Sequence, residues 1–289
     1  MKTARFVRFF KYLNWATLVK TFQEAGKQRL PGLASEMAYN AMLALFPSIL
    51  ALFTAIGLFA RLQSTFEYIA DQLGKVAPHE ALFLIQGFVN TISSTQNQSL
   101  FSLSFIVALW TASGALSAAM TALDHIHQIP PEHRRPFWQA KLVAIALTIG
   151  TILLLITASF LVFISDLTMK LVASQTGSFQ TKLLSFWRLL IWPAALGIVA
   201  LAVSFIYRYG PSHWRRGTPI LPGAIVASLS WAILSGLFRL YVSNFGNYNV
   251  AYGAVGTFIV LMLWLNLTSL VMLFGAQLNV SVGEAMKRK

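Results

Sequence analysis

The side chains of this chain best suited to chemistry are a few polar residues that interrupt or border long apolar runs. Glu36 opens the apolar run 37–60, and Tyr39 and Asn40 follow about one helical turn later. A carboxylate well inside a bilayer costs about 2.5–3.5 kcal/mol, so such a residue usually has a partner or a substrate. Arg208 is the cation expected at the same depth, and a guanidinium holds a carboxylate through two N–H groups. We therefore predict that Glu36 and Arg208 meet.

Further polar residues lie at the ends of other apolar runs. Segment 241–253 contains three Tyr, three Asn and two Gly but no charge. Gly and Asn tolerate positive φ and Tyr anchors membrane interfaces, so a tight, hydrogen-bonded connection is predicted there. Arg239 is equally well explained as a charge that snorkels to the interface. The candidate residues of a polar path or substrate site are Glu36, Tyr39, Asn40, Tyr207, Arg208, Arg239, Asn244, Tyr248 and Tyr252.

The chain lacks the residue sets of common enzymes. It has no cysteine, no G-x-x-x-x-G-K-[ST] phosphate loop, and no H-E-x-x-H or G-x-S-x-G motif. Ser113 has no histidine within any apolar run to activate it. His125 and His127 are two residues apart and point to different helix faces, so with His133 they are better explained as ordinary loop residues than as metal ligands. We predict a protein that is not an enzyme, with no metal and no cofactor.

The composition indicates which elements must position the polar residues. Of 289 residues, 56% are hydrophobic and 11% are charged, whereas a soluble domain has about 25% charged residues. This balance argues against a soluble enzyme and against a disordered chain. Six runs carry no charge and have about the 20 residues that a transmembrane helix needs. They are 37–60, 99–123, 142–165, 189–207, 217–238 and 250–282.

These runs are continuous, as membrane helices are, whereas barrel strands alternate between apolar and polar residues. The predicted fold is therefore an all-α integral membrane bundle of six transmembrane helices. Pro47 lies inside the first run, where its ring clashes with the carbonyl one turn earlier. We predict a helix kink at Pro47.

The distribution of basic residues predicts the orientation. With six spans, 16 Lys and Arg lie on the side of the two termini and 4 lie on the opposite side. The positive-inside rule then places both termini in the cytoplasm, in the inner (plasma) membrane. This asymmetry accounts for most of the net charge of +13, so no nucleic-acid partner is predicted.

The N-terminal segment is predicted to be an amphipathic interfacial helix. Within residues 5–25, Phe6, Phe10 and Leu13 recur at helical spacing among basic residues, a pattern that favours membrane lipids with anionic headgroups at the cytoplasmic face. A mitochondrial transit peptide would be rich in Ser, and a cleaved secretory signal would have an earlier and shorter apolar run. The predicted regions are a cytoplasmic amphipathic segment 1–30, a transmembrane domain 31–283 and a basic tail 284–289.

Several short segments together resemble a known family. They are EMAY at 36–39, LFP at 45–47, ALWTASGA at 108–115, YRYGP at 207–211, PGA at 222–224, the segment 241–253 and GAQLN at 275–279. With them, nearly the whole chain resembles the YihY/virulence factor BrkB family of six-span inner-membrane proteins. Two positions depart from the family's pattern: Gln277 stands where Glu is usual, and Asp124 where Asn is common.

The resemblance implies a role in the cell envelope, and some members carry a ribonuclease label that no residue set here supports. We therefore expect a multi-pass envelope protein that is transporter-like or handles a lipid or small molecule. The alternative is a non-transporting structural or interaction protein, and a membrane-bound nuclease ranks last. A homo-oligomer is left open, as is the effect of Gln277 on the mechanism.

Overall fold

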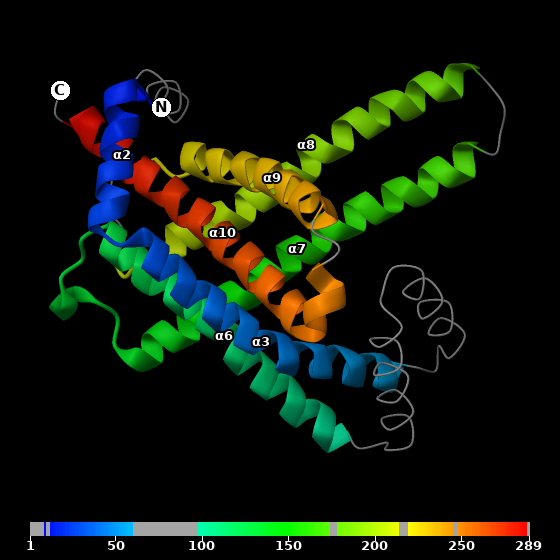
Figure 1. Ribbon diagram of the computed structural model, residues 1–289, viewed down its shortest axis with the longest axis horizontal. Coiled ribbons are helices and arrows are strands. Elements are labelled where there is room, and N and C mark those ends of the chain that lie inside the picture. Colours follow the sequence, from blue (N-terminus) through cyan, green and yellow to red (C-terminus); the bar gives the residue numbers. More distant parts are fainter. Residues whose placement is uncertain are drawn as a thin grey trace. The chain divides into compact units, whose positions relative to one another are not determined.

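The structure is a computed structural model that describes residues 9, 12–59, 98–173, 178–213, 219–244 and 248–287. These residues form seven α-helices and one short 3-10 helix, η2 (Pro131–His133), and contain no strand. The α-helices (Figure 1) are α2 (Trp15–Lys27), α3 (Leu30–Phe59), α6 (Gln98–Ile126), α7 (Phe137–Ala173), α8 (Ser178–Tyr209), α9 (Leu221–Asn244) and α10 (Tyr248–Lys287).

Each predicted span falls on one long helix, from α3 and α6 through to α10. Among the described residues, parts of α6, α7, α9 and α10 are long and apolar enough to cross a membrane: Phe105–Ile126, Phe137–Ala158, Leu221–Val242 and Phe258–Lys287. The all-α membrane class is therefore confirmed. The fifth span is predicted to begin at 217, which lies outside the described residues; α9 begins at Leu221, where Pro222 sits in the first turn and needs no hydrogen-bonded N–H.

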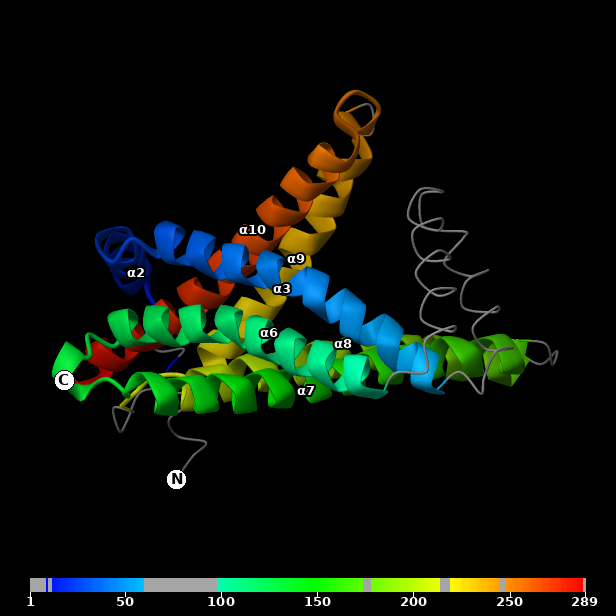
Figure 2. The same cartoon turned by 90° about the horizontal axis from the view of Figure 1, so that it is seen from below.

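Helices α7 and α8 are longer than the spans predicted within them. They have 37 and 32 residues, which correspond to about 55 and 48 Å at 1.5 Å per residue, against roughly 30 Å of hydrocarbon. The expected outer connection 166–188 is therefore helical except for 174–177, which lies outside the described residues. Figure 2 shows the two helices side by side. A helix leaving the lipid can keep its own hydrogen bonds in water, so charged residues do not end it.

The chain divides into two compact units, residues 1–39 with 115–289 and residues 40–114. In the smaller unit, a methyl group on Gly114 of α6 would lie 3.0 Å from Oδ1 of Asn40 on α3. The small residue therefore leaves room for the amide. Helix α3 is continuous through Pro47, but the side chains of 46–59 lie outside the description, so the kink stays a prediction.

Residues 9 and 12 of the predicted amphipathic segment 5–25 are helical, and helix α2 follows from Trp15 to Lys27. Its N-cap is Asn14, whose side-chain oxygen accepts a hydrogen bond from the N–H of Thr17 at 2.9 Å, a contact that fixes the helix start. Phe6 and Phe10 lie outside the described residues, and Leu13 packs against the cluster of Phe9, Leu278 and Val282.

The connection from α2 to α3 consists of only two residues, Gln28 and Arg29. Arg29 has a positive φ of 54°, a backbone conformation that ends one helix before the next begins but is disfavoured for a residue with a Cβ. Gln128 does the same after α6 with φ 52°. There the N–H of Ile129 bonds to Asp124 O and that of Gln128 to His125 O, both at 2.9 Å, as in a Schellman cap.

The core of the larger unit lies where α3, α6, α8, α9 and α10 meet. Small residues allow their backbones to approach closely, and the buried set includes Ala34, Ala118, Ala119, Ala122, Ala224 and Ala276. Leu30, Leu123, Ile126, Tyr207 and Leu273 fill the remaining space. The close approach in turn leaves room for only a few polar side chains.

Candidate functional site

Polar groups gather where α8, α9 and α10 meet. The hydroxyl of Tyr207 donates to the carbonyl of Met272 across this contact. A methyl group on Gly275 would lie 2.6 Å from both the Tyr207 hydroxyl and the carbonyl oxygen of Gly223. Gly275 is thus the residue that lets the three helices touch.

Asn279 of α10 fastens the start of α9. Its Oδ1 accepts from the N–H of Gly223 at 2.8 Å, and its Nδ2 donates to the carbonyl of Ile220 at 2.9 Å. Ile220 holds the N-cap position but has no side-chain oxygen, so Asn279 supplies the cap from another helix. A methyl group on Gly223 would lie 2.4 Å from the Asn279 amide, so the two residues interlock.

A buried carboxylate joins the end of α6 to the segment after α8. Oδ1 of Asp124 accepts from the N–H of Ser212, and Oδ2 accepts from its hydroxyl, both at 2.6 Å. Hydrogen bonds to a carboxylate are shorter and stronger than neutral ones. Asp124 is therefore a structural anchor between two connections at the same end of the bundle.

Arg135 completes this anchor. Its guanidinium donates to the carbonyls of Gly210 at 2.7 Å, Pro211 at 2.8 Å and Tyr209 at 3.2 Å. These carbonyls follow the last turn of α8, where a cation is favourable. Burial lowers the pKa of Arg135, and the charge of Asp124 opposes that effect. The guanidinium remains charged and fixes the course of the chain between α8 and α9.

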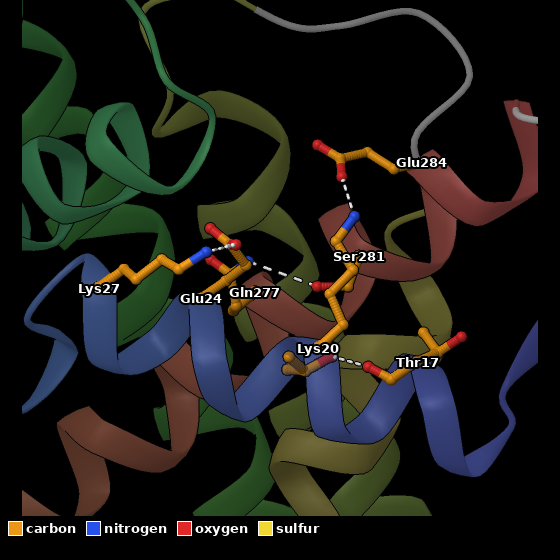
Figure 3. Close-up of polar contacts among 8 residues, drawn as sticks. Thr17, Lys20, Glu24, Lys27, Gln277, Ser281 and Glu284 are labelled. Carbon is orange, nitrogen blue, oxygen red and sulfur yellow. Dashed lines mark hydrogen bonds and ion pairs between the residues drawn. The ribbon is translucent and has the colours of Figure 1, made fainter.

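The third polar junction lies between α2 and α10 (Figure 3). Lys20 of α2 and Glu284 of α10 form an ion pair at 2.6 Å. About two turns before Glu284 on α10, Nε2 of Gln277 lies 3.4 Å from the hydroxyl of Ser281, a long hydrogen bond. Gln277 is only 2% exposed, and its Oε1 has no hydrogen-bond partner among the described residues. Thr17 and Thr21 of α2 are also buried.

The residues predicted to form a polar path lie in different surroundings. Tyr207 is buried and bonded to α10, whereas its neighbour Arg208 is exposed. Glu36, Tyr39 and Arg239 are exposed. Asn244 ends α9, Tyr248 begins α10 and Tyr252 follows in α10, but their side chains lie outside the description. The meeting of Glu36 and Arg208 stays a prediction.

The histidines have separate environments. His127 is buried, with Nδ1 2.9 Å from the carbonyl of Leu123, whereas His125 is exposed. The ring centroids of His133 and His213 are 6.0 Å apart. Within the described part of the chain, no three His, Asp or Glu residues form a group that could hold a metal ion.

Sequence reasoning missed the anchoring roles of Asp124, Asn279 and Ser212 and the burial of Gln277. Asp124 and Gln277 had a signal, because each departs from the pattern of the resembling family. Asn279 belongs to the family-like segment 275–279 but was not distinguished within it. Ser212 gave no signal, because its role depends on the packing of α6 beside α8.

The described helices and their polar junctions define a polytopic helical membrane protein. The profile of the family described as "Virulence factor BrkB" matches residues 21–289. The chain belongs to the virulence factor BrkB family.

Relatives cover most of the chain. The ribonuclease-like protein YfkH of Bacillus subtilis is 29% identical over 88% of this chain and 90% of its own length. A UPF0761 membrane protein of Alteromonas mediterranea is 27% identical over 89% of this chain and 84% of its own. One from Photobacterium profundum is 28% identical over 89% and 77%. No solved structure matches.

Proposed function

We propose that this chain is a multi-pass inner-membrane protein that crosses the bilayer six times with both termini in the cytoplasm. The asymmetry of basic residues supports this orientation. The structure adds support, because the N-terminal segment packs against the C-terminal part of α10: Phe9 clusters with Leu278 and Val282, and Lys20 pairs with Glu284. Both ends then lie on one side, which requires an even number of crossings.

We further propose that the protein is transporter-like and handles a lipid or a small polar molecule. The observation that carries this proposal is Gln277, a buried amide on a membrane helix whose Oε1 has no partner among the described residues. An unsatisfied buried polar group costs about 1–3 kcal/mol, and polar residues within membrane helices usually serve function.

Gln277 heads a row of polar residues along α10. Ser281 follows four residues later and Glu284 three after that, so the three share one helix face. The row runs from the apolar part of α10 to its end, where Glu284 is partly exposed. Such a row suits passage of a polar headgroup or solute, with Glu36 and Arg208 as further contributors.

The ribonuclease-like name belongs to YfkH, and we propose that the present chain is not an enzyme. His127 is buried against the carbonyl of Leu123, while His125 points into solvent. This arrangement supports structural and surface roles for them. The following experiment distinguishes a transporter from the alternative, a non-transporting envelope protein.

The full chain is reconstituted into liposomes, and two fluxes are measured. One is reduction by dithionite of a fluorescent NBD-phosphatidylglycerol, and the other is stopped-flow swelling with small polyols. We expect one flux to exceed that of empty liposomes and to fall roughly tenfold in Gln277→Leu, because one hydrogen-bonding group is worth about 1.4 kcal/mol. Asn266→Leu is the matched control, because Asn266 lies on the same helix but is only half-buried, and its amide donates to Ser35 in an exposed hydrogen bond.

Absence of both fluxes from a folded, reconstituted chain would favour the structural alternative. Equal fluxes in the two variants would remove Gln277 from the path while leaving a transport function in place.

A further inference from the structure

Helix α2 presents an apolar stripe outward. Trp15, Val19 and Phe22 are 79%, 37% and 66% exposed, and their spacing of four and three residues puts them on one helix face. The opposite face carries the buried Thr17 and Thr21. The helix is therefore amphipathic in an unusual sense, because it turns polar residues toward the protein and large apolar residues away from it.

The position of α2 limits what this stripe can meet. Only two residues separate α2 from α3, and α3 carries the first predicted span, so α2 must stay at the level of the membrane surface. The ring of Phe22 lies 4.7 Å, between centroids, from that of Phe274 on α10. The stripe thus continues onto the surface of a membrane helix rather than ending in a water-facing part of the protein.

Aromatic residues elsewhere in the larger unit also indicate where the membrane surface lies. Phe137 and Trp138, in the first turn of α7, are both exposed. Tyr209, at the end of α8, is exposed as well. Exposed aromatic residues at helix ends are typical of a membrane–water interface.

The charge beside the stripe is basic. Lys27 has a 70% exposed side chain, and Arg29 is exposed in the turn after the helix. Glu24 is the one acidic residue of α2, and it already pairs with Lys27 at 2.9 Å. Basic residues beside an apolar stripe are complementary to anionic lipid headgroups, whereas they do not favour the equally basic surface of a second copy.

We propose that α2 is a docking surface for an anionic lipid bilayer. Trp15, Val19 and Phe22 enter the boundary between headgroups and acyl chains, and Lys27 and Arg29 contact the headgroups. The proposal deepens the membrane arrangement given above and rests on α3 crossing the bilayer. It does not depend on transport, so its failure is distinguishable from an absence of flux.

The absence of cysteine makes spin labelling a direct test. Single cysteines replace Trp15, Val19 or Phe22, and Glu132→Cys in the exposed η2 is the water-facing control. Each labelled full chain is placed in nanodiscs of phosphatidylcholine, alone or mixed equally with phosphatidylglycerol. Electron paramagnetic resonance then measures collisions with oxygen, which enters lipid, and with a nickel chelate, which stays in water.

We expect the stripe labels to collide mainly with oxygen, about 5–10 Å below the headgroup boundary, and the control label to collide mainly with nickel. Phosphatidylglycerol should increase the depth of the stripe labels in the bilayer. The double substitution Lys27→Gln and Arg29→Gln should abolish this increase in depth. Stripe labels as accessible to nickel as the control would overturn the proposal. So would labels protected from both reagents with spin–spin coupling between copies, since a second chain would then cover the stripe.

Discussion

The cap that Asn279 places on α9 makes a quantitative prediction about stability. Asn279→Ala removes two hydrogen bonds, of 2.8 and 2.9 Å, from a side chain only 3% exposed. It leaves the N–H of Gly223 without a partner, whereas the carbonyl of Ile220 keeps the hydrogen bond that it accepts from the N–H of Ala224 at 3.2 Å. With about 1–3 kcal/mol for the orphaned N–H and about 1 kcal/mol for the lost hydrogen bond to Ile220, we expect the free energy of unfolding to fall by about 2–4 kcal/mol.

Gly223→Ala should be about as damaging by a different route. The new methyl group would lie 2.4 Å from the Asn279 amide, so the amide must move and both hydrogen bonds break. In a chain that already carries Asn279→Ala the obstacle is gone, and the second change should be nearly neutral. The double-mutant cycle should therefore give a coupling of roughly −2 kcal/mol, within the usual range for residues in contact.

The assay is reversible unfolding in mixed micelles, followed by helical circular dichroism. Asn266→Ala is the matched control, because it removes one exposed hydrogen bond, to Ser35, from the same helix, and a loss below about 1 kcal/mol is expected. Additive effects of the two substitutions, or an Asn279→Ala loss no larger than that of the control, would refute the interlocked cap.

Other substitutions test the remaining contacts by the same assay. Gly275→Ala should prevent close packing, since its methyl would lie 2.6 Å from the rigid carbonyl of Gly223, and no Asn substitution should rescue it. Asp124→Ala should cost about 2–4 kcal/mol by removing both hydrogen bonds to Ser212, whose hydroxyl keeps only the bond that it accepts from the N–H of Arg135. Asp124→Asn should cost less, because an amide can still accept one bond; equal losses would contradict the anchor. Gln128→Gly should raise stability by about 1 kcal/mol, because Gln128 has a positive φ; a loss would show that its side chain matters more.

The sequence predicted the elements of the fold well because hydrophobic runs report directly on membrane helices. Each predicted span, from 37–60 to 250–282, falls on a long helix. The helix ends were less accessible. The helices α7 and α8 continue beyond their apolar runs because a helix satisfies its own backbone groups in water as in lipid, so a charged residue such as Lys170 marks the edge of the lipid and not the end of the helix.

The candidate site was harder to predict because its contacts depend on which helices touch. Glu36 and Arg208 were singled out as charges at the membrane edge, yet the polar contacts that the structure describes in most detail involve Asn279, Asp124 and Gln277. Asn279 and Ile220 are 59 residues apart, and no local pattern links an amide to a helix start that lacks its own cap. Such pairings become visible only when α9 lies against α10.

The ion pair between Lys20 and Glu284 has a consequence for the making of the protein. Its two residues are 264 positions apart, and a ribosome adding about 5–20 residues per second needs roughly 13 to 53 s to cover that interval. Throughout that time α2 has emerged but its partner on α10 does not exist. Helix α2 must therefore wait at the bilayer until α10 is made, so the contact between the two is among the last to form during biosynthesis.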